Sequence, residues 1–329
     1  MTFLLTALVV GLLPLWLVVA FAIDLVRKAR RGTPFAVSRL IAFGAVYLLG
    51  EVIGVLALAS SWLLAGVGPG RESRILAYTY AIQRAWVGVL LATVKFFYNV
   101  RIALEGEDTL GPAPGGPLVV LMQHTSLVDT LLPTTYLTAR RGLKLRWVLK
   151  KELLVDPSLD IAGLRLPNAF VGRDGSDTDK ALAMVRALAT DLPSDEGVLI
   201  YPEGTRFTPQ KRLRALDRLS ATPDLQARAA RLKRVLPPRL GGPLALLETA
   251  ADADVLFIAH VGFEGLSSVG AVLSGDLVGR TIRLHLRRIP RTKVPTDRAA
   301  LVEWLWTEWE ALDAWVDAEV LGQRSQGLK

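Results

Sequence analysis

The sequence VVLMQHTSLVD, residues 119–129, decides how the rest of the chain is interpreted. Its apolar beginning is rich in Val and Leu, which predicts a buried strand. A polar step that carries His124 follows, and the next apolar run predicts a helix that Thr125 or Ser126 can cap. The strand-to-helix turn therefore places an imidazole shortly before the carboxylate of Asp129.

An imidazole and a carboxylate at this spacing can share one catalytic task. Asp129 is close enough to accept the Nδ1 proton of His124, which leaves Nε2 free to take a proton from a substrate hydroxyl. The simpler alternative is a polar loop histidine and a helix-face aspartate that do not interact. The pair alone does not distinguish these alternatives.

The composition points to a membrane and to anionic partners. Of the 329 residues, 51% are hydrophobic, and the formal net charge is +8. So high an apolar content favours lipid, and the positive charge suits phospholipid headgroups or phosphorylated cosubstrates. No nucleic-acid motif is found, so we expect no nucleic-acid partner. The chain has no Cys and only three His without zinc-ligand spacing, so a cysteine acyl-enzyme is excluded and no metal is expected.

The N-terminal part predicts a membrane-anchoring helical hairpin over residues 1–70. Phe3 to Ile23 is long enough to cross a hydrocarbon core of about 30 Å, and it lacks the basic start and cleavage site of a signal peptide. The basic loop from Arg27 to Arg39 is predicted to be cytoplasmic. Leu40 to Val67 is the second apolar run, and its one acidic residue, Glu51, should face another helix.

A third apolar stretch, Ile75 to Tyr98, leaves the topology open. It could cross the membrane, although Arg84 lies inside it, or it could be a packed helix of the following domain. Its mixture of apolar residues with Arg84 and Lys95 suits an amphipathic helix in the membrane interface. We favour that interpretation for residues 71–105, with the first two helices forming a shallow hairpin.

After Val100 the pattern becomes that of an α/β domain, in which a mostly parallel sheet is flanked by helices. We expect this domain over residues 106–295 and a Trp-rich helix over residues 296–329. The predicted strands are Leu118–Met122, Leu145–Leu149, Ala169–Val171, Val198–Tyr201, Val255–Val261 and Thr281–Arg288. The predicted helices are Leu127–Thr138, Asp177–Asp191, Pro243–Ala251 and Thr296–Val320.

The two other histidines receive simpler interpretations. In the last predicted strand, Arg283, His285 and Arg287 alternate with apolar residues, which indicates one solvated face and makes His285 a surface residue. His260 closes the preceding strand, and we interpret it as a core or edge histidine rather than a catalytic one.

A second cluster, NAFVGRD at residues 168–174, is a strand that ends in Gly and Arg. The guanidinium of Arg173 could bind a phosphate through two parallel hydrogen bonds, and Gly172 would let that phosphate approach the backbone. The alternative for Arg173 is a salt bridge to Asp174 or a solvated loop charge.

A third cluster, YPEGTR at residues 201–206, follows another predicted strand. Gly204 allows a sharp turn with exposed amides, Thr205 adds a hydroxyl, and Arg206 adds a second phosphate-binding charge. Glu203 could hydrogen-bond a substrate hydroxyl or lock the loop. Its structural alternative is an ion pair with Arg206 or Arg173.

The order and spacing of the three clusters resemble the glycerolipid acyltransferase superfamily, on its 1-acylglycerol-3-phosphate and lysophospholipid acyltransferase branch, which includes lysocardiolipin acyltransferase-like proteins. The resemblance covers roughly residues 95–320. Motif I (HX4D) falls on His124 and Asp129, motif II on Phe170, Gly172 and Arg173, and motif III on Glu203, Gly204, Thr205 and Arg206. One departure is that many relatives carry a Pro in a fourth motif, on the strand Val255–Val261, where this chain has none.

The resemblance implies transfer of a fatty acyl group from a thioester to the free hydroxyl of a lysophospholipid, with 1-acylglycerol 3-phosphate as the preferred acceptor and phosphatidic acid as the product. His124 would be the general base, and Arg173 and Arg206 would hold the acceptor's phosphate. Acyl-CoA or an acyl carrier protein thioester would be the cosubstrate, with no bound cofactor. Because such thioesters are cytosolic, the catalytic domain of this membrane-bound protein should face the cytoplasm.

Several alternatives remain open from the residues alone. The acceptor could be another lysophospholipid, in a remodelling reaction. Ser126 beside His124 could serve a lipid hydrolase, although no Gly-x-Ser-x-Gly elbow is present. The protein could also be an inactive, membrane-anchored binding protein. The basic segment from Lys211 to Arg239 could contact coenzyme A, an acyl carrier protein or anionic lipid, or be a solvated face balanced by Asp217 and Asp224.

Overall fold

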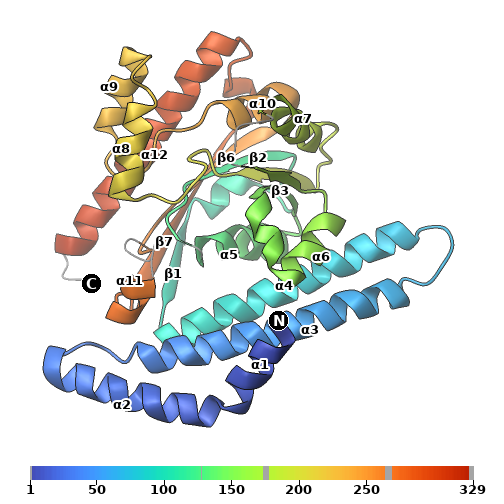
Figure 1. Ribbon diagram of the computed structural model, residues 1–329. Coiled ribbons are helices and arrows are strands. Elements are labelled where there is room, and N and C mark those ends of the chain that lie inside the picture. The colour runs from blue at the N-terminus through green and yellow to red at the C-terminus, as the bar shows by residue number, and fades with distance from the viewer. Residues whose placement is uncertain (1, 127, 173–177, 264–268, 326–329) are drawn as a thin grey trace.

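The apolar run Leu118–Met122 forms the central strand of a seven-stranded sheet (Figure 1). The computed structural model describes residues 2–126, 128–172, 178–263 and 269–325. The sheet has the strand order β1-β7-β6-β2-β5-β3-β4. Its strands are β1 (Arg101–Glu105), β2 (Leu118–Met122), β3 (Lys144–Lys150), β4 (Ala169–Val171), β5 (Glu196–Ile200), β6 (Asp254–Val261) and β7 (Thr281–Ile289).

The sheet is mostly parallel, as the alternation of strands and helices predicts. Strand β2 runs parallel to both β5 and β6, and β3 runs parallel to both β5 and β4. Only β7 and its parallel partner β1 run the other way, since β7 is antiparallel to β6. The carboxyl ends of β2, β4, β5 and β6 therefore meet at one edge, which is where ligands bind in open sheets of this kind.

Both faces of β2 are buried, which explains its uninterrupted apolar sequence. Val119 and Leu121 point to the face covered by α7 (Thr178–Ala189), α10 (Gly241–Thr249) and α12 (Arg298–Ser325). Leu118, Val120 and Met122 point to the other face, against α4 (Arg71–Tyr98) and the helical segment after His124. Alternate residues of one strand thus hold both layers in place.

The remaining helices connect the strands or form the N-terminal part. The bounds are α1 (Thr2–Gly11), α2 (Leu13–Arg31), α3 (Val37–Leu64), α5 (Leu131–Pro133), α6 (Pro157–Arg165), α8 (Pro209–Asp217), α9 (Pro223–Arg231) and α11 (Val269–Ser274). The single helix predicted for Leu127–Thr138 is a 3-10 turn at Val128–Thr130, then α5, then a π-helix at Thr134–Ala139. Strand β1 and helices α6, α8, α9 and α11 were not predicted.

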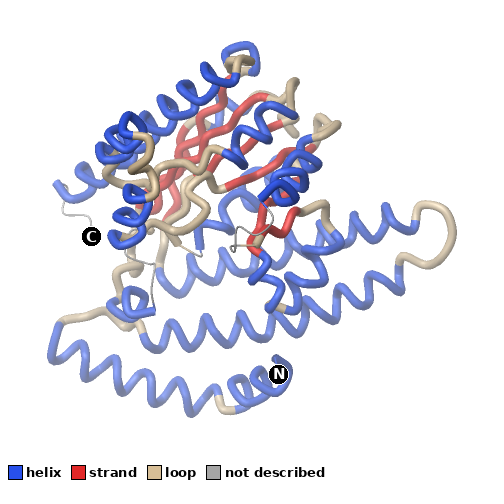
Figure 2. Tube along the Cα trace, turned by 45° about the horizontal axis from the view of Figure 1, so that its top comes forward, coloured by secondary structure: helices blue, strands red, loops and turns tan. Residues whose placement is uncertain are grey.

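Helices α1 to α4 lie together beneath the sheet domain (Figures 1 and 2). Helices α3 and α4 are each long and apolar enough to cross a membrane, and α1 with α2 would count as a third span, broken by a bend of 62°. The predicted span Phe3–Ile23 is therefore two helices, and α2 continues into the basic stretch. Asp24 caps α3 by accepting from the amides of Val37 and Ser38 at 3.0 and 2.9 Å.

Helix α3 is attached to the catalytic domain along its middle. Glu51 is buried, and its backbone carbonyl accepts from the hydroxyl of Ser158 on α6 at 3.2 Å. Further along, Arg165 of α6 donates to the carbonyl oxygen of Leu58 at 2.9 Å. The acidic residue inside the apolar run thus faces another helix, as predicted, and that helix belongs to the sheet domain.

The expected alternation of β7 is present, and its more exposed face is partly covered at His285. The ring of His285 stacks on Trp315 of α12, with ring centroids 4.9 Å apart. Trp306 and Trp309 of the same helix are fully buried, and the indole of Trp309 donates to the carbonyl of Leu236 at 2.9 Å. The prediction of a surface histidine was wrong because a helix from the far end of the chain packs across this face.

Candidate active site

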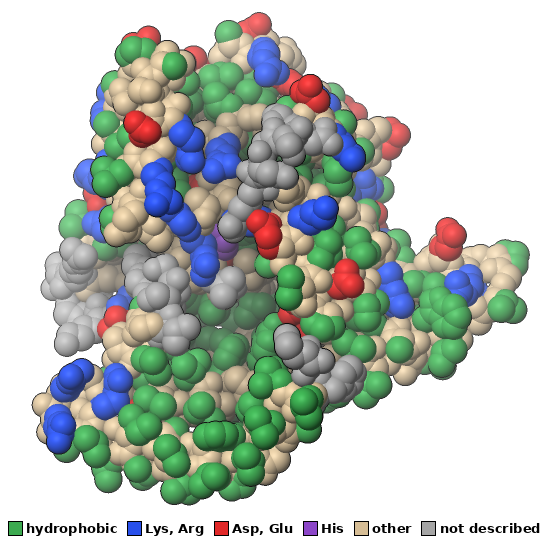
Figure 3. Space-filling view, in the orientation of Figure 1, with side chains coloured by type: hydrophobic (Ala, Val, Ile, Leu, Met, Phe, Trp, Pro, Cys, Tyr) green, Lys and Arg blue, Asp and Glu red, His purple; other side chains and the backbone are tan. Residues whose placement is uncertain are grey.

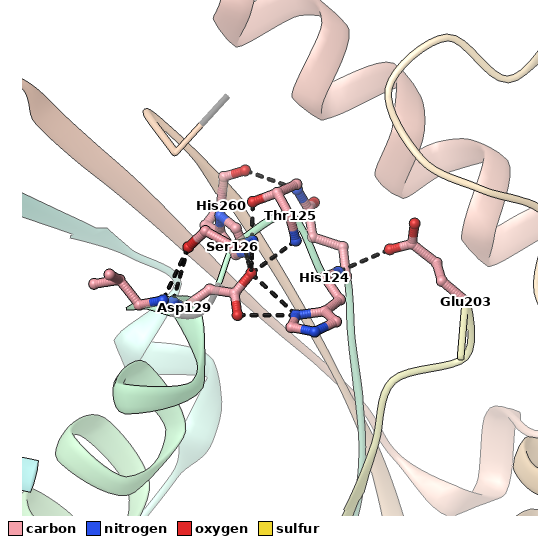
Figure 4. A network of polar contacts seen from close by, with 8 residues as sticks. His124, Thr125, Ser126, Asp129, Glu203 and His260 are labelled. Atoms are coloured by element: carbon pink, nitrogen blue, oxygen red, sulfur yellow. Dashed lines mark hydrogen bonds and ion pairs between the residues drawn. The ribbon is translucent and has the colours of Figure 1, made fainter. Parts of the chain in front are cut away.

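His124 and Asp129 meet at the carboxyl edge of the sheet, just past the end of β2 (Figure 4). Nδ1 of His124 lies 3.0 Å from Oδ1 of Asp129. The imidazole is 13% exposed and the carboxylate is fully buried. No described residue bonds Nε2 of His124, so this nitrogen is available to a substrate. The interacting pair is the first of the two alternatives that the sequence left open.

The carboxylate of Asp129 is held by its own loop. Its Oδ2 accepts from the amides of Thr125 and Ser126 at 2.7 and 2.8 Å. Burial raises the pKa of Asp129, but the contacts with His124 and His260 outweigh that effect and hold the pKa well below its ordinary value. Asp129 is therefore a fixed negative charge beside the imidazole.

Ser126 closes the same turn from the other side. Its hydroxyl oxygen accepts from the amides of Val128 and Asp129 at 3.1 and 3.2 Å, which is the predicted capping role. The side chain is fully buried. A buried capping hydroxyl does not reach a substrate, so this geometry speaks against Ser126 as a nucleophile.

Glu203 connects three loops rather than facing the substrate side. Its Oε1 accepts from the amide of His124 at 2.7 Å, and its Oε2 accepts from the amide of Leu236 at 2.9 Å. The side chain is only 2% exposed. Burial raises the pKa of Glu203 to about 8, against the lowering effect of the two amides. Of the two roles that the sequence allowed, this geometry favours locking the loop.

The loop after β5 wraps around the histidine. The amide of Phe207 donates to the carbonyl of His124 at 3.0 Å, and the ring of Tyr201 lies against the imidazole with centroids 4.5 Å apart. These contacts place the Gly204–Arg206 turn beside His124. Gly204 has φ +64°, a conformation that favours glycine.

The amides of this turn differ in their availability. The amide of Gly204 donates to the carbonyl of Tyr201 at 2.9 Å, so it is already used. No described residue accepts from the amides of Thr205 or Arg206. If this loop stabilises an oxyanion, those two amides are the candidates.

Two motif II residues, Phe170 and Gly172, lie on and just after β4. The ring of Phe170 packs against Gly163 of α6, so it supports the sheet rather than lining an open surface. Gly172 is exposed just past the strand. Arg173 lies outside the described residues, so the structure does not place its guanidinium.

Part of the basic segment from Lys211 to Arg239 forms ion pairs with acidic residues of α12. Arg228 binds Glu303 and Glu310, and Arg234 binds Asp317. The proposed counter-charges on the segment itself, Asp217 and Asp224, do not form these pairs. In Figure 3, Lys and Arg side chains gather above a hollow in which a histidine is visible.

Two residues that the sequence analysis did not assign to the site lie next to it. The side chain of Arg239 lies against Gly204, where a β-carbon would come within 3.0 Å of its Cδ. No carboxylate of the described residues pairs with Arg239, whose pKa is lowered by burial and by the nearby charge of Arg218. His260 lies with Nε2 3.4 Å from Oδ2 of Asp129. Arg239 ends the basic segment that the sequence singled out, whereas His260 is marked by no local motif and comes from a distant strand.

Comparison with known proteins agrees with this architecture. The family model described as Acyltransferase matches residues 101–238. The crystal structure of the 1-acyl-sn-glycerophosphate acyltransferase from Thermotoga maritima superposes with a TM-score of 0.50 at 13% identity, covering 85% of this chain and 97% of that one. The superposition shows a shared fold, and the family match shows that residues 101–238 carry an acyltransferase domain.

Two curated acyltransferases are similar to this chain. The 1-acyl-sn-glycerol-3-phosphate acyltransferase gamma of Mus musculus is 27% identical over 203 residues, covering 60% of this chain and 52% of that protein. The lysophosphatidylinositol acyltransferase 10 of Caenorhabditis elegans is 22% identical over 240 residues, covering 68% and 57%. The chain spans about half the length of the curated relatives it matches. These similarities agree with the predicted resemblance to the 1-acylglycerol-3-phosphate and lysophospholipid acyltransferase branch.

Proposed function

We propose that the protein transfers a fatty acyl group from an acyl thioester to the free hydroxyl of a lysophospholipid, with 1-acylglycerol 3-phosphate as the preferred acceptor. The observation that carries this proposal is the His124–Asp129 pair at 3.0 Å, with Nε2 unbonded by any described residue. A buried carboxylate on Nδ1 orients the imidazole and stabilises its protonated form. Such a base contributes about 10²- to 10⁴-fold to the rate.

In this mechanism His124 acts directly on the acceptor. Nε2 takes the proton of the glycerol hydroxyl while its oxygen attacks the thioester carbonyl. The tetrahedral intermediate collapses with cleavage of the C–S bond, and the imidazolium returns the proton to the leaving thiolate. The amides of Thr205 and Arg206 are the proposed donors to the oxyanion. Because the thioester is already activated, no covalent enzyme intermediate and no bound cofactor are needed.

The acceptor's phosphate is proposed to bind beside the Gly204 turn. Arg206 is part of this turn, and Arg239 packs onto it without a carboxylate partner among the described residues. Guanidinium groups bind phosphate through paired hydrogen bonds, so Arg206 and Arg239 form a suitable site. Arg173, which lies outside the described residues, remains the third proposed phosphate ligand from the sequence. The leading donors are acyl-CoA and acyl carrier protein thioesters.

The long apolar helices indicate a membrane-associated protein, and we propose that α3 and α4 lie in the interface instead of crossing it. Glu51 and Leu58 of α3 are bonded to α6 of the catalytic domain. A full crossing by α3 would carry α6 to the depth of the hydrocarbon, where unpaired polar groups are costly. The opposite face of α3 exposes apolar side chains, including Ile53 at 57% and Leu56 at 56%, which suit the acyl-chain region.

Activity is tested with the purified protein in detergent, using palmitoyl- and oleoyl-coenzyme A, or the corresponding acyl carrier protein thioesters, against a panel of lysophospholipids. Mass spectrometry separates acylated lipid from free fatty acid. Transfer to lysophosphatidate that is lost in His124→Ala supports the proposal, and an active His124→Ala protein refutes the general base. His285→Ala is the matched control, because His285 stacks on Trp315. Faster transfer to another lysolipid would indicate remodelling, and release of free acid alone would indicate a hydrolase.

The membrane arrangement has a separate test, for which the absence of Cys in the chain is an advantage. A single cysteine is introduced at Val67, which is 92% exposed in the turn between α3 and α4. An interfacial hairpin leaves this turn on the same side as the catalytic domain, whereas two crossings carry it to the other side. A cysteine at Leu213, 65% exposed on α8, reports the side of the catalytic domain. Labelling of the two positions from opposite sides by an impermeant maleimide refutes the interfacial arrangement.

A further inference from the structure

A second histidine lies against the carboxylate of the proposed catalytic pair (Figure 4). His260 is near the end of β6, which neighbours β2 in the sheet. Its side chain is fully buried, and its Nε2 lies 3.4 Å from Oδ2 of Asp129. The ring meets Phe263 edge to face with centroids 5.4 Å apart. Its carbonyl accepts from the buried side-chain amide of Gln123 at 2.9 Å, which ties β6 to the end of β2.

Both oxygens of Asp129 face Nδ1 of His124, Oδ1 at 3.0 Å and Oδ2 at 3.3 Å. Oδ2 also accepts from the two loop amides and lies 3.4 Å from Nε2 of His260. Neither buried ring nitrogen of His260 forms a hydrogen bond with a described residue, so Nε2 meets Oδ2 as an electrostatic contact at 3.4 Å. A proton on Nε2 meets a negative oxygen, whereas a bare Nε2 would direct a lone pair at it. The contact at 3.4 Å therefore favours a proton on Nε2.

We propose that His260 is a positioning residue of the active site, whose imidazole lies against Oδ2 of Asp129 and favours the shorter contact between Oδ1 and Nδ1 of His124. The inference rests on the proposed function for its kinetic consequences, though not for the tautomer itself. The role differs from that of His124, because His260 is enclosed and reaches the substrate only through Asp129. Its contribution is to fix the rotation of the carboxylate and to share its negative charge.

The sharing of the negative charge of Asp129 predicts in which direction the pH–rate profile moves when His260 is replaced. An N–H directed at Oδ2 draws negative charge away from Oδ1, so Asp129 holds a proton on His124 less strongly and the base stays free at lower pH. The other titratable groups that interact with this carboxylate are Tyr201 and Glu203, both after β5. The strands beside β6 present Gln123 and Leu284 near His260, which are uncharged.

The first test measures the tautomer in the intact protein without turnover. The chain has three histidines, so ¹⁵N-histidine labelling gives three imidazoles to assign. His260→Gln and His285→Gln identify two of them by loss of signal. We expect a proton on Nε2 of His260 and a bare Nδ1. A proton on Nδ1 would overturn the proposal, whether or not the protein is active on the lipids supplied.

The second test compares two replacements at the same position. His260→Phe preserves a ring but removes the donor, and His260→Gln offers an amide N–H near the position of Nε2. We expect Phe to lower kcat about 10-fold or more with little change in KM, as a displaced base does. The acidic limb of its pH–rate profile should move up by about half a pH unit. Gln should restore most of kcat and the parental limb.

The outcomes separate the role of His260 from general stability. A folded Phe variant with parental kcat and an unchanged acidic limb overturns the proposal. A loss of kcat that is equal in the Phe and Gln variants, with no movement of the limb, shows a structural role only and also overturns it. If the Phe variant does not fold, the tautomer measurement decides. His285→Gln is the matched control, and it should retain the parental rate and profile.

Discussion

Glu203→Gln nearly preserves the shape of the side chain. It tests whether Glu203 locks the active-site loops or takes part in proton transfer. In the parent, one oxygen accepts from the amide of His124 at 2.7 Å and the other from the amide of Leu236 at 2.9 Å. A carboxyl group keeps an acceptor lone pair on both oxygens even when it is protonated. The carboxamide of Gln has only one acceptor, and its NH₂ group must face the other backbone N–H.

The expected loss of stability follows from the number of acceptors. One buried hydrogen bond is lost and one backbone donor is left unsatisfied, which costs about 1–3 kcal/mol of unfolding free energy. We expect the melting temperature of Glu203→Gln to fall by several degrees. A lock that is weakened but still present should reduce kcat by less than about 10-fold, whereas loss of a proton-transfer group costs about 10²- to 10⁴-fold.

The assay combines thermal unfolding, followed by Trp fluorescence in detergent, with initial rates of acyl transfer. Trp306 and Trp309 are buried beside the loop that Glu203 holds, so their emission reports this region. Glu196→Gln is the control, because Glu196 forms an ion pair with Arg146 at 2.6 Å outside the catalytic loops. A Glu203→Gln protein with parental stability and a rate reduced about 1,000-fold would refute the locking role and restore a catalytic one.

Three further predictions follow from the same cluster. Because burial raises the pKa of Glu203 to about 8, above its value of about 4.3 in the unfolded chain, its favourable contribution is present at low pH and is lost as the pH rises through this range. The stability difference between the parent and Glu203→Gln should therefore shrink from pH 5 to pH 8.5, and a difference that grows would contradict this. Asp129→Asn should lower kcat by about 10³-fold or more, since an amide favours the wrong tautomer of His124, and initial rates within 10-fold of the parent would disprove the pairing. Ser126→Ala should cost about 0.5–2 kcal/mol in thermal unfolding while keeping most of the activity, because Ser126 is a helix cap. An inactive but stable Ser126→Ala protein would support the alternative function as a serine hydrolase.

The sequence predicted the strands that carry an uninterrupted apolar run. The predicted limits of β2 and β4 agree with the structure. For β2 the reason is that a strand buried on both faces shows its length directly in its composition. Strand β1 has no such signal. It is an edge strand whose only partner, β7, comes from a distant part of the chain, so its pairing depends on the completed sheet.

The pairing of His124 with Asp129 was also accessible to sequence analysis, because both residues belong to one turn and local geometry decides their contact. The neighbours of that pair were not. Glu203 binds the amide of His124 across the gap between two strands, and His260 reaches Asp129 from a third strand. Spacing along the chain carries no information on such contacts, so the sequence favoured a simple core role for His260.

By itself the sequence determined the class of fold, the family and the position of the His–Asp turn, because apolar periodicity and short motifs are local properties. Only the tertiary structure decided that Glu203 is a buried lock, that α12 neutralises much of the basic segment, and that α3 is bonded to the catalytic domain. Each of these depends on which segments become neighbours when the sheet closes. Burial and charge pairing are properties of that arrangement, and they take their values only after distant parts of the chain have come together.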